Sequence, residues 1–373
     1  MDAQDSPSRR KPRCPCCGID AHAHWFPPQR MELLEREGPR HGVVLGHNKK
    51  GYRTAEGGGL PFRQTFAADM IDLDCIIESM APARLDMRIL SLTNPMVFWA
   101  PEGLGLELAR TFNDACGEAI RHHPSRIRGA ITLPLQSPEL ALKELARAAE
   151  IPGMCCAYSA MHVNGTNIDD RSFWPIYEFC EARGLPLCLH PVAPCGGTDR
   201  LTDYHMRNVV GNPHESAIGA ACLIFGGVLD AFPKLKILLP HAGGSFPWLV
   251  GRWDNGVRRR PELAHVKQPA SAYLRRFHYD TISHDAQLIR YLVDRIGADR
   301  FVLGTDYNMD AGVERPVDFV EEVPGLTDEE LRLIARDNVM SLFDLSLPEA
   351  VSGAVRIASC VSRSMLREGS PPG

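Results

Sequence analysis

The stretch Gly18–His24, which reads GIDAHAH, is the first of eight short apolar runs in a chain of 373 residues. Most of the runs are continuous rather than alternating, which is typical of parallel strands covered on both faces. Helical patterns separate them, so the sequence predicts a closed (β/α)8 barrel, the TIM-barrel class of α/β folds. The runs are Gly18–His24, Met87–Thr93, Arg128–Pro134, Gly153–Ser159, Leu185–Pro191, Lys236–Gly243, Phe277–Ser283 and Phe301–Tyr307.

The segments between the runs carry helix start signals. Ser137 is an N-cap residue followed by a proline at the first helical position. Thr327 and Glu330 form a capping-box pattern before an apolar run. Asp170–Arg183 and Asp285–Ile296 show helical spacing of their apolar residues. These signals favour helices between the predicted strands.

Two long stretches interrupt this rhythm. Residues 25–66 predict an insertion after the first strand, and residues 192–214 predict a long loop after the fifth. Both follow the carboxyl ends of strands, where barrel active sites form. The predicted organisation is a flexible leader at 1–17, a single barrel domain at 18–348 and a tail at 349–373.

The composition excludes several classes of protein. Lys plus Arg is 41 and Asp plus Glu is 46, a net charge of -5, which argues against a nucleic-acid-binding protein. No apolar stretch reaches the roughly 18 residues of a membrane span, and the polar N-terminus is unlike a secretory signal. The scattered cysteines, such as Cys155, Cys156, Cys188 and Cys222, indicate reduced thiols and a cytoplasmic location. For the cluster Cys14–Cys17 a flexible leader is favoured over a zinc knuckle.

Polar side chains close four of the predicted strands. His22 and His24 are two residues apart, so they project from the same face of the first strand. His190, His241 and Asp306 close the fifth, sixth and eighth strands. Groups of this kind are costly to bury unpaired, and neutral imidazoles with a carboxylate are good ligands for a divalent metal. The alternative for each histidine alone is an ordinary core or surface residue, but five such residues at strand ends predict a metal site in the barrel mouth.

These motifs, together with the turn His241–Gly244 and the segment Gly304–Tyr307, resemble the amidohydrolase superfamily. More narrowly, they resemble its branch of metal-dependent decarboxylases, typified by 2-amino-3-carboxymuconate-6-semialdehyde decarboxylase. The resemblance extends from Ile19 to Leu345. Further matches to that branch are Phe232–Lys236, Gly243–Pro247 and Val250–Arg252.

The resemblance implies a catalytic pair and a metal cofactor. It gives His241 the role of acid or base beside the metal, with Asp306 as a second participant in proton transfer. The fourth strand, Gly153–Ser159, lacks the lysine that holds a second metal in many members, so one ion is expected. That ion is zinc, with manganese as the alternative. The implied ligands are His22, His24, His190 and Asp306.

Four further residues are candidates for substrate contact. Arg63 stands where the branch binds a substrate carboxylate, and Arg252 where an arginine reaches the neighbouring subunit of a dimer. The alternative for either is a surface arginine that covers apolar area. His162 follows the fourth strand, and Asn208 stands where the branch has an aromatic substrate contact. The branch commonly has proline after the tyrosine of the last motif, whereas this chain has Asn308, at a position expected to border the substrate pocket.

The expected function is non-oxidative removal of CO₂ from an aromatic or muconate-like carboxylic acid by a metal-dependent homodimer. One alternative is a hydrolase or hydratase of the same superfamily, in which water activated by the metal attacks a lactone, an amide or a double bond. Another is a barrel without catalytic activity that serves as a binding or scaffold protein. Release of CO₂ separates the first two, and metal content separates both from the third.

Overall fold

The computed structural model of the chain describes residues 17–60, 63–192 and 200–346. Except for Cys17, the predicted leader lies outside these residues, and so does the predicted tail at 349–373. The domain boundaries therefore stay predictions. Within the described part, no helix is long and apolar enough to cross a membrane.

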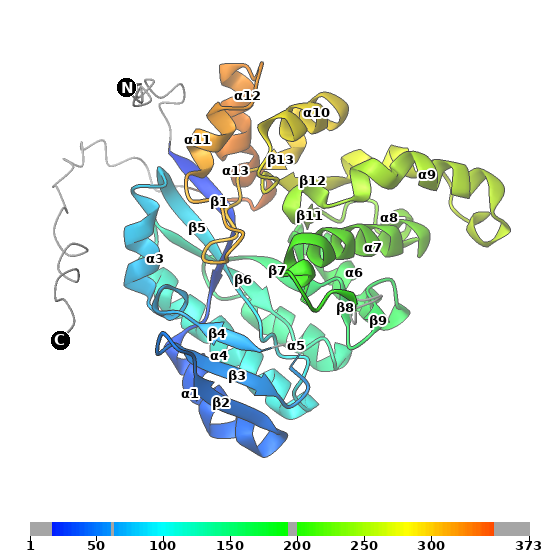
Figure 1. The fold of residues 1–373 in the computed structure, drawn as a ribbon. Coiled ribbons are helices and arrows are strands. Elements are labelled where there is room, and N and C mark those ends of the chain that lie inside the picture. Colours follow the sequence, from blue (N-terminus) through cyan, green and yellow to red (C-terminus); the bar gives the residue numbers. More distant parts are fainter. Residues whose placement is uncertain (1–16, 61–62, 193–199, 347–373) are drawn as a thin grey trace, which may run out of the picture.

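Eight parallel strands form the centre of the molecule, and neighbouring strands pair in the order β1-β5-β6-β7-β10-β11-β12-β13 (Figure 1). The strands are almost entirely buried, as their apolar sequences predicted. Their bounds are β1 Gly18–Trp25, β5 Leu85–Leu92, β6 Ile127–Thr132, β7 Met154–Ala160, β10 Leu187–His190, β11 Ile237–Leu239, β12 Phe277–Asp280 and β13 Phe301–Val302.

The sheet closes between its first strand and the segment after its last. Ala23 forms a parallel bridge with Tyr307. The amide of Ala21 donates to the carbonyl of Leu303 at 2.9 Å. The prediction of a (β/α)8 barrel is therefore confirmed.

A buried charged pair reinforces this closure. The Nε of Arg88 donates to Oδ2 of Asp20 at 3.1 Å, and both side chains are buried. The amide of Thr305 donates to the other oxygen of Asp20 at 3.1 Å, while the Arg88 guanidinium lies 3.9 Å from the centre of the Tyr307 ring. These contacts hold the chain after β13 against β1 and so fix the segment that carries Asp306.

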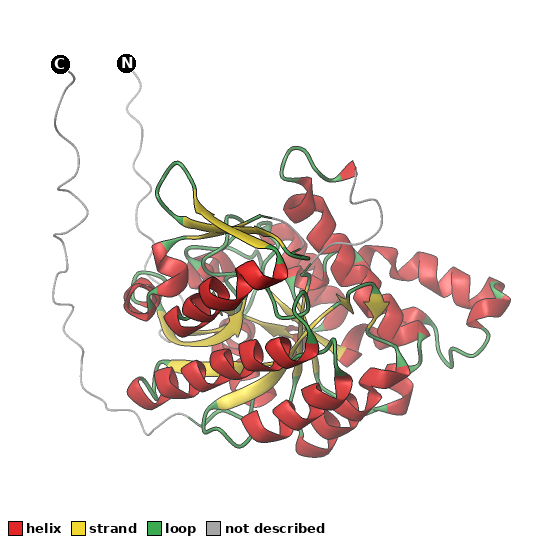
Figure 2. Cartoon of the chain, turned by 90° about the horizontal axis from the view of Figure 1, so that it is seen from below, coloured by secondary structure: helices red, strands yellow, loops and turns green. Residues whose placement is uncertain are grey.

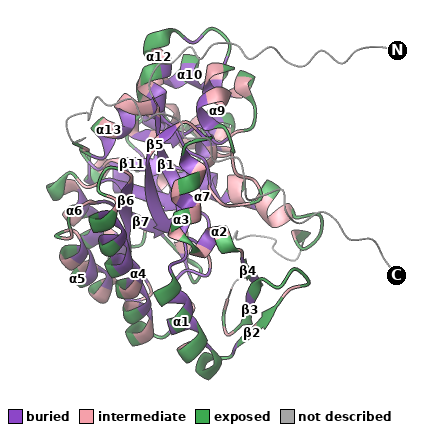
Figure 3. Cartoon of the chain, turned by 90° about the vertical axis from the view of Figure 1, so that its left-hand side faces the viewer, coloured by how far each residue is buried: buried purple, intermediate pink, exposed green. Residues whose placement is uncertain are grey.

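Helices surround the strands (Figure 2) and turn their exposed faces outward (Figure 3). The α-helices that follow β5 in the chain are α4 Glu102–His122, α5 Pro138–Ala148, α6 Trp174–Arg183, α7 Asn212–Phe225, α8 Val228–Ala231, α9 Phe246–Arg259, α10 Ala286–Ile296, α11 Pro316–Glu321, α12 Asp328–Arg332 and α13 Asn338–Leu342. Short π-helical turns at Arg207–Gly211 and Leu333–Asp337 lead into α7 and α13.

Most predicted helix starts are confirmed. The helix predicted from Asp170 opens with a 3-10 turn at Arg171–Phe173, and α6 itself begins at Trp174. Thr327 and Glu330 form a complete capping box on α12. Asp285 accepts from two amides at the start of α10. Ser137 precedes α5 as predicted, but its hydroxyl donates to Glu102 at 3.2 Å instead of capping the helix. A neighbouring helix thus competes for the hydroxyl that local sequence would assign to the cap.

The stretch after β1 contains regular structure of its own. Helix α1 (Pro28–Glu37) leads into an antiparallel sheet of β2 (Val43–His47), β3 (Arg53–Gly57) and β4 (Gln64–Phe66). The chain then returns to β5 through α2 (Ala68–Ile71) and α3 (Leu73–Met80). Much of this small sheet is exposed beside the barrel (Figure 3).

Several strands are shorter than predicted, including β10 and β12, and two others stop furthest from their predicted ends. β11 ends at Leu239 and β13 at Val302, before the polar residues that follow them. His241, Ala242 and Asp306 have φ values of 55°, 52° and 53°, in the left-handed region, where no strand continues. The chain therefore turns sharply at these two strand ends.

Candidate metal centre and active site

Three histidines and one aspartate meet at the carboxyl ends of the strands. His22 and His24 lie on one face of β1, with ring centres 5.1 Å apart. His190, at the end of β10, lies 5.0 Å from the first ring and 4.8 Å from the second. Asp306 completes the group, with its Oδ1 at 3.0 Å from Nε2 of His24 and 3.5 Å from Nε2 of His22. The predicted ligands therefore converge.

The donor set fits a single divalent metal ion. One ligand atom from each of the four residues lies within 4.8 Å of the others, and all four side chains are buried. The Nε2 atoms of His22 and His190 have no hydrogen-bond partner, although they are buried. Metal–nitrogen bonds are about 2.0–2.1 Å long, so two ligand atoms on opposite sides of one ion lie roughly 4 Å apart, which is comparable with the spread of these four atoms. A cation would satisfy the two orphaned nitrogens.

Two of the histidines are held through their second ring nitrogens. Nδ1 of His22 lies 2.8 Å from Oδ2 of Asp280. Nδ1 of His24 lies 2.9 Å from the hydroxyl of Ser91, and this hydroxyl donates to the carbonyl of Ala23 at 3.1 Å. Since that hydroxyl proton is already used, Nδ1 of His24 is the donor. In both rings Nε2 is then left with a free lone pair for a metal.

Burial controls the charge of the histidines. It lowers the pKa of His190 to about 3 and lowers that of His24 as well. Both are thus neutral imidazoles near neutral pH, the form that binds metal. Burial also opposes protonation of His22, but the hydrogen bond with Asp280 and the charge of Asp306 outweigh it and raise the pKa of His22.

Asp306 is the common partner of the site. Burial alone would raise its pKa, but contacts with His190, His24 and His241 hold the pKa of this carboxyl well below its usual range. The carboxylate therefore stays charged through the physiological range. It supplies the one negative charge among the four predicted ligands.

His241 lies on the other side of this carboxylate. Its Nε2 is 3.7 Å from Oδ2 of Asp306, whereas the other three histidines face Oδ1. Its ring centre lies 5.6 Å from that of His22 and 5.7 Å from that of His190. The imidazole thus borders the cluster without being part of it, at a position suited to moving a proton.

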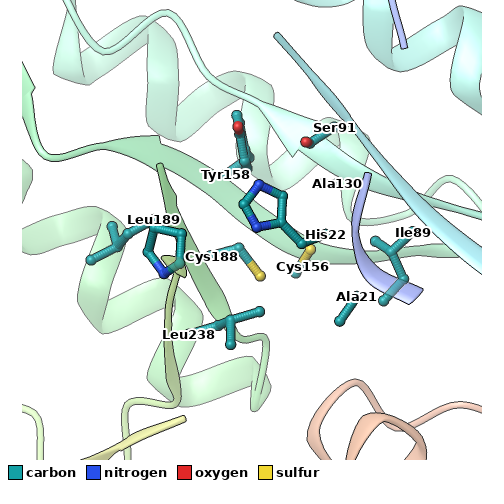
Figure 4. Close-up of a pocket in the computed structure, with 11 residues that line it drawn as sticks. Ala21, His22, Ile89, Ser91, Ala130, Cys156, Tyr158, Cys188, Leu189 and Leu238 are labelled. Atoms are coloured by element: carbon teal, nitrogen blue, oxygen red, sulfur yellow. The ribbon is translucent and has the colours of Figure 1, made fainter. Parts of the chain in front are cut away.

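A largely apolar cavity lies in the barrel interior next to this cluster (Figure 4). Tyr158 of β7 faces into it, and the buried hydroxyl of this tyrosine has no hydrogen-bond partner. The lining residues are Ala21, His22, Ile89, Ser91, Ala130, Cys156, Tyr158, Cys188, Leu189, Leu238 and Pro240.

The four predicted substrate contacts lie on other elements. Arg63 donates to Thr54 of β3 at 3.4 Å and is about half exposed. His162 accepts from the amide of Gly165 in a short hairpin after β7. Asn208 is half-buried in the π-helical turn before α7, and Arg252 is exposed on α9. The structure thus gathers the predicted metal ligands and His241, while the roles of these four stay predictions.

Sequence reasoning missed Asp280, Ser91 and Tyr158. Asp280 closes β12 just as the predicted ligands close their strands, so its position was the available signal. Ser91 and Tyr158 stand inside apolar runs, and nothing in the sequence sets them apart. The eight cysteines in the described residues are free.

Comparison with known proteins agrees with this architecture. The amidohydrolase family model matches residues 19–345. A 2-amino-3-carboxymuconate-6-semialdehyde decarboxylase from Dictyostelium discoideum is 31% identical over 331 residues, which is 88% of this chain and 91% of that protein.

Two crystal structures are similar in fold as well as in sequence. The 5-carboxyvanillate decarboxylase from Sphingomonas paucimobilis has a TM-score of 0.76 and 25% identity, over 88% of this chain and 99% of its own. A dihydroxybenzoic acid decarboxylase from Polaromonas sp. JS666, with bound manganese and the inhibitor 2-nitroresorcinol, has a TM-score of 0.71 and 25% identity, over 88% and 97%. With a family match that spans the whole barrel, the chain belongs to the amidohydrolase family.

Proposed function

We propose that this protein is a metal-dependent, non-oxidative decarboxylase of an aromatic or muconate-like carboxylic acid. The observation that carries the proposal is the arrangement around Asp306, with three histidines at one carboxylate oxygen and His241 at the other. The similar proteins described above are decarboxylases, which favours this reaction over hydrolysis or hydration.

The metal would be held by His22, His24, His190 and Asp306. When bound, a divalent ion supplies Lewis-acid chemistry, because it polarises oxygen atoms and stabilises negative charge that develops on the substrate. The manganese in the dihydroxybenzoic acid decarboxylase supports a divalent ion of this kind here. We propose zinc as the native metal, with manganese as the alternative.

The chain's own groups account for the proton. When the bond between the substrate carbon and its carboxylate breaks, the electron pair stays on that carbon and CO₂ leaves. The carbon then takes up one proton. The product is therefore the substrate with a hydrogen atom in place of the carboxylate group. We assign the supply of this proton to His241, because it borders the ligand set and is exposed enough to recover a proton from solvent. We assign the binding of the substrate to Arg63, Arg252, His162 and Asn208.

A direct assay tests this function. Metal-reconstituted protein is mixed with ring acids that carry an ortho hydroxyl or amino group and with muconate-like open-chain acids. We expect CO₂ release from at least one acid, with none from protein stripped of metal. If the loaded protein releases no CO₂ but hydrolyses a lactone or an amide, the hydrolase alternative is correct. Purified protein with far less than one equivalent of metal would instead support a non-catalytic barrel.

We also propose a homodimer in which Arg252 reaches the partner's site. Arg252 is exposed on α9 one turn after Trp248, a residue that is 58% exposed. An exposed tryptophan beside an arginine is typical of protein interfaces. Sedimentation should give a dimer, and Arg252→Ala should lower the affinity for substrate while the dimer persists. A fully active monomer would exclude this role. The free cysteines support a reducing compartment, for which we propose the cytoplasm.

A further inference from the structure

Asp280 connects the end of β12 with two other parts of the active site. It ends β12 and is completely buried. One oxygen, Oδ2, lies 2.8 Å from Nδ1 of His22 on β1. The other, Oδ1, accepts from the amide of Ala242 at 2.9 Å and from the amide of Ile282 at 3.0 Å. One carboxylate thus contacts both a metal ligand and the turn that follows His241.

The contact with His22 decides which ring nitrogen is free. A carboxylate accepts hydrogen bonds and has no proton to donate, so Nδ1 of His22 must carry the hydrogen. Nε2 is then the lone-pair nitrogen, and this is the atom that faces Asp306 at 3.5 Å. Without the carboxylate, the imidazole is free to adopt the other tautomer or another ring orientation, and neither presents Nε2 to a metal.

The contact with Ala242 holds a turn in an unusual conformation. His241 and Ala242 both have φ values in the left-handed region, at 55° and 52°. Residues other than glycine adopt this region rarely, and two in succession need support from their surroundings. Within the turn, the amide of Gly244 donates to the carbonyl of His241 at 2.8 Å. Asp280, on the neighbouring strand, adds a hydrogen bond to this turn and so fixes the backbone position of His241.

The packing around Asp280 leaves little freedom. Gly304 lies against both halves of the pair: a Cβ at this position would come within 2.9 Å of Cβ of Asp280 and 3.2 Å of Cβ of His22. The chain after β13 therefore closes over the contact between the two side chains. This enclosure shields the hydrogen bond from water and keeps the pair in register.

We propose that Asp280 is a positioning residue with two separable tasks. Through Oδ2 it sets the tautomer and orientation of His22 for metal binding, and through Oδ1 it fixes the turn that aims His241. The first task rests on the proposed metal-dependent function, whereas the second concerns the conformation of the protein alone.

The substitution Asp280→Asn separates the two tasks. The amide oxygen of asparagine can still accept from the amides of Ala242 and Ile282, and these two donors fix its orientation. The NH₂ group then faces Nδ1 of His22 and donates to it, so the hydrogen moves to Nε2 and blocks the ligand atom. The substitution Asp280→Ala removes both contacts. Asp285→Asn is the matched control, because Asp285 caps α10 nearby and asparagine caps equally well.

The readouts are affinity for Mn²⁺, measured by titration of metal-free protein, and hydrogen exchange of the peptide that contains Ala242, measured by mass spectrometry. We expect Asp280→Asn to weaken Mn²⁺ binding about 10- to 100-fold while exchange at this peptide stays as in the parent protein. Asp280→Ala should weaken binding at least as much and also speed exchange at the peptide about tenfold or more. Asp285→Asn should change neither.

Each task can fail separately. Parent-like Mn²⁺ affinity in Asp280→Asn would overturn the role at His22, and so would a parent protein without affinity for divalent metal. Unchanged exchange in Asp280→Ala would overturn the role at the turn. If the alanine variant does not fold, faster exchange at the Ala242 peptide in Asp280→Asn would show that the tasks are not separable. A parent protein that binds Mn²⁺ but releases no CO₂ would refute the decarboxylase and leave this test intact.

Discussion

We expect the His241→Ala variant to keep its metal ion and to lose most of its turnover, with kcat about 10²- to 10⁴-fold lower. The reason is geometric. Nε2 of His241 lies 3.7 Å from Oδ2 of Asp306, whereas the other three histidines face Oδ1 of the same carboxylate. Loss of this imidazole leaves the four predicted ligands intact and removes the group to which we assign delivery of the proton. Metal content by elemental analysis and steady-state CO₂ release measure the two effects separately.

His284→Ala is the matched control for this variant. His284 is an exposed histidine after the next strand, and its φ of 57° is close to the 55° of His241. The cost of placing alanine in a left-handed conformation is therefore the same in both variants. We expect the control to keep full activity. Turnover at the parent rate in His241→Ala would remove His241 from the mechanism, and loss of metal from it would make His241 a ligand.

Much of the fold could be predicted from sequence because a barrel is built from a local pattern. A strand such as β7 is buried on both faces, so it appears as a continuous apolar run. The sheet of β2, β3 and β4 carries no such signal, since its strands are short and partly exposed. The pairing of these strands therefore cannot be predicted from a pattern of buried apolar residues. The sharp turns at His241 and Asp306 also escaped prediction, because tertiary contacts hold non-glycine residues at positive φ there.

The site shows the same division between local and distant information. His22 and His24 could be paired from their spacing alone, because a strand projects alternate residues to one face. Their meeting with Asp306 required only that the strands close into a barrel. The contact of Asp280 with His22 was not predicted, although Asp280 also ends a strand of the barrel. Polar residues at strand ends are often turn or cap residues, and only packing across the barrel separates these roles.

The Asp306→Ala variant should lose both metal and activity. This carboxylate offers one oxygen to His24 at 3.0 Å, His22 at 3.5 Å and His190 at 3.9 Å. It is the single negative charge among the four predicted ligands, so its removal takes away a ligand and leaves a cation with neutral imidazoles only. We expect metal affinity to fall more than about 100-fold, beyond the effect of losing a residue that only orients a ligand. Titration with Zn²⁺ or Mn²⁺ measures the affinity, and CO₂ release should fall in proportion to metal occupancy.

Asp310→Ala is the control for Asp306→Ala. It shows whether the effect comes from losing the metal ligand or from losing any carboxylate in this segment. Asp310 lies four residues further on, its side chain is 86% exposed, and it approaches His205 at 3.7 Å instead of the cluster. Its removal should leave both metal content and turnover at the parent level. If Asp306→Ala kept a full equivalent of metal, the ion would have to be bound without this carboxylate. The convergence of His22, His24 and His190 would then have to be explained by something other than a shared cation, and the proposed chemistry would lose its basis.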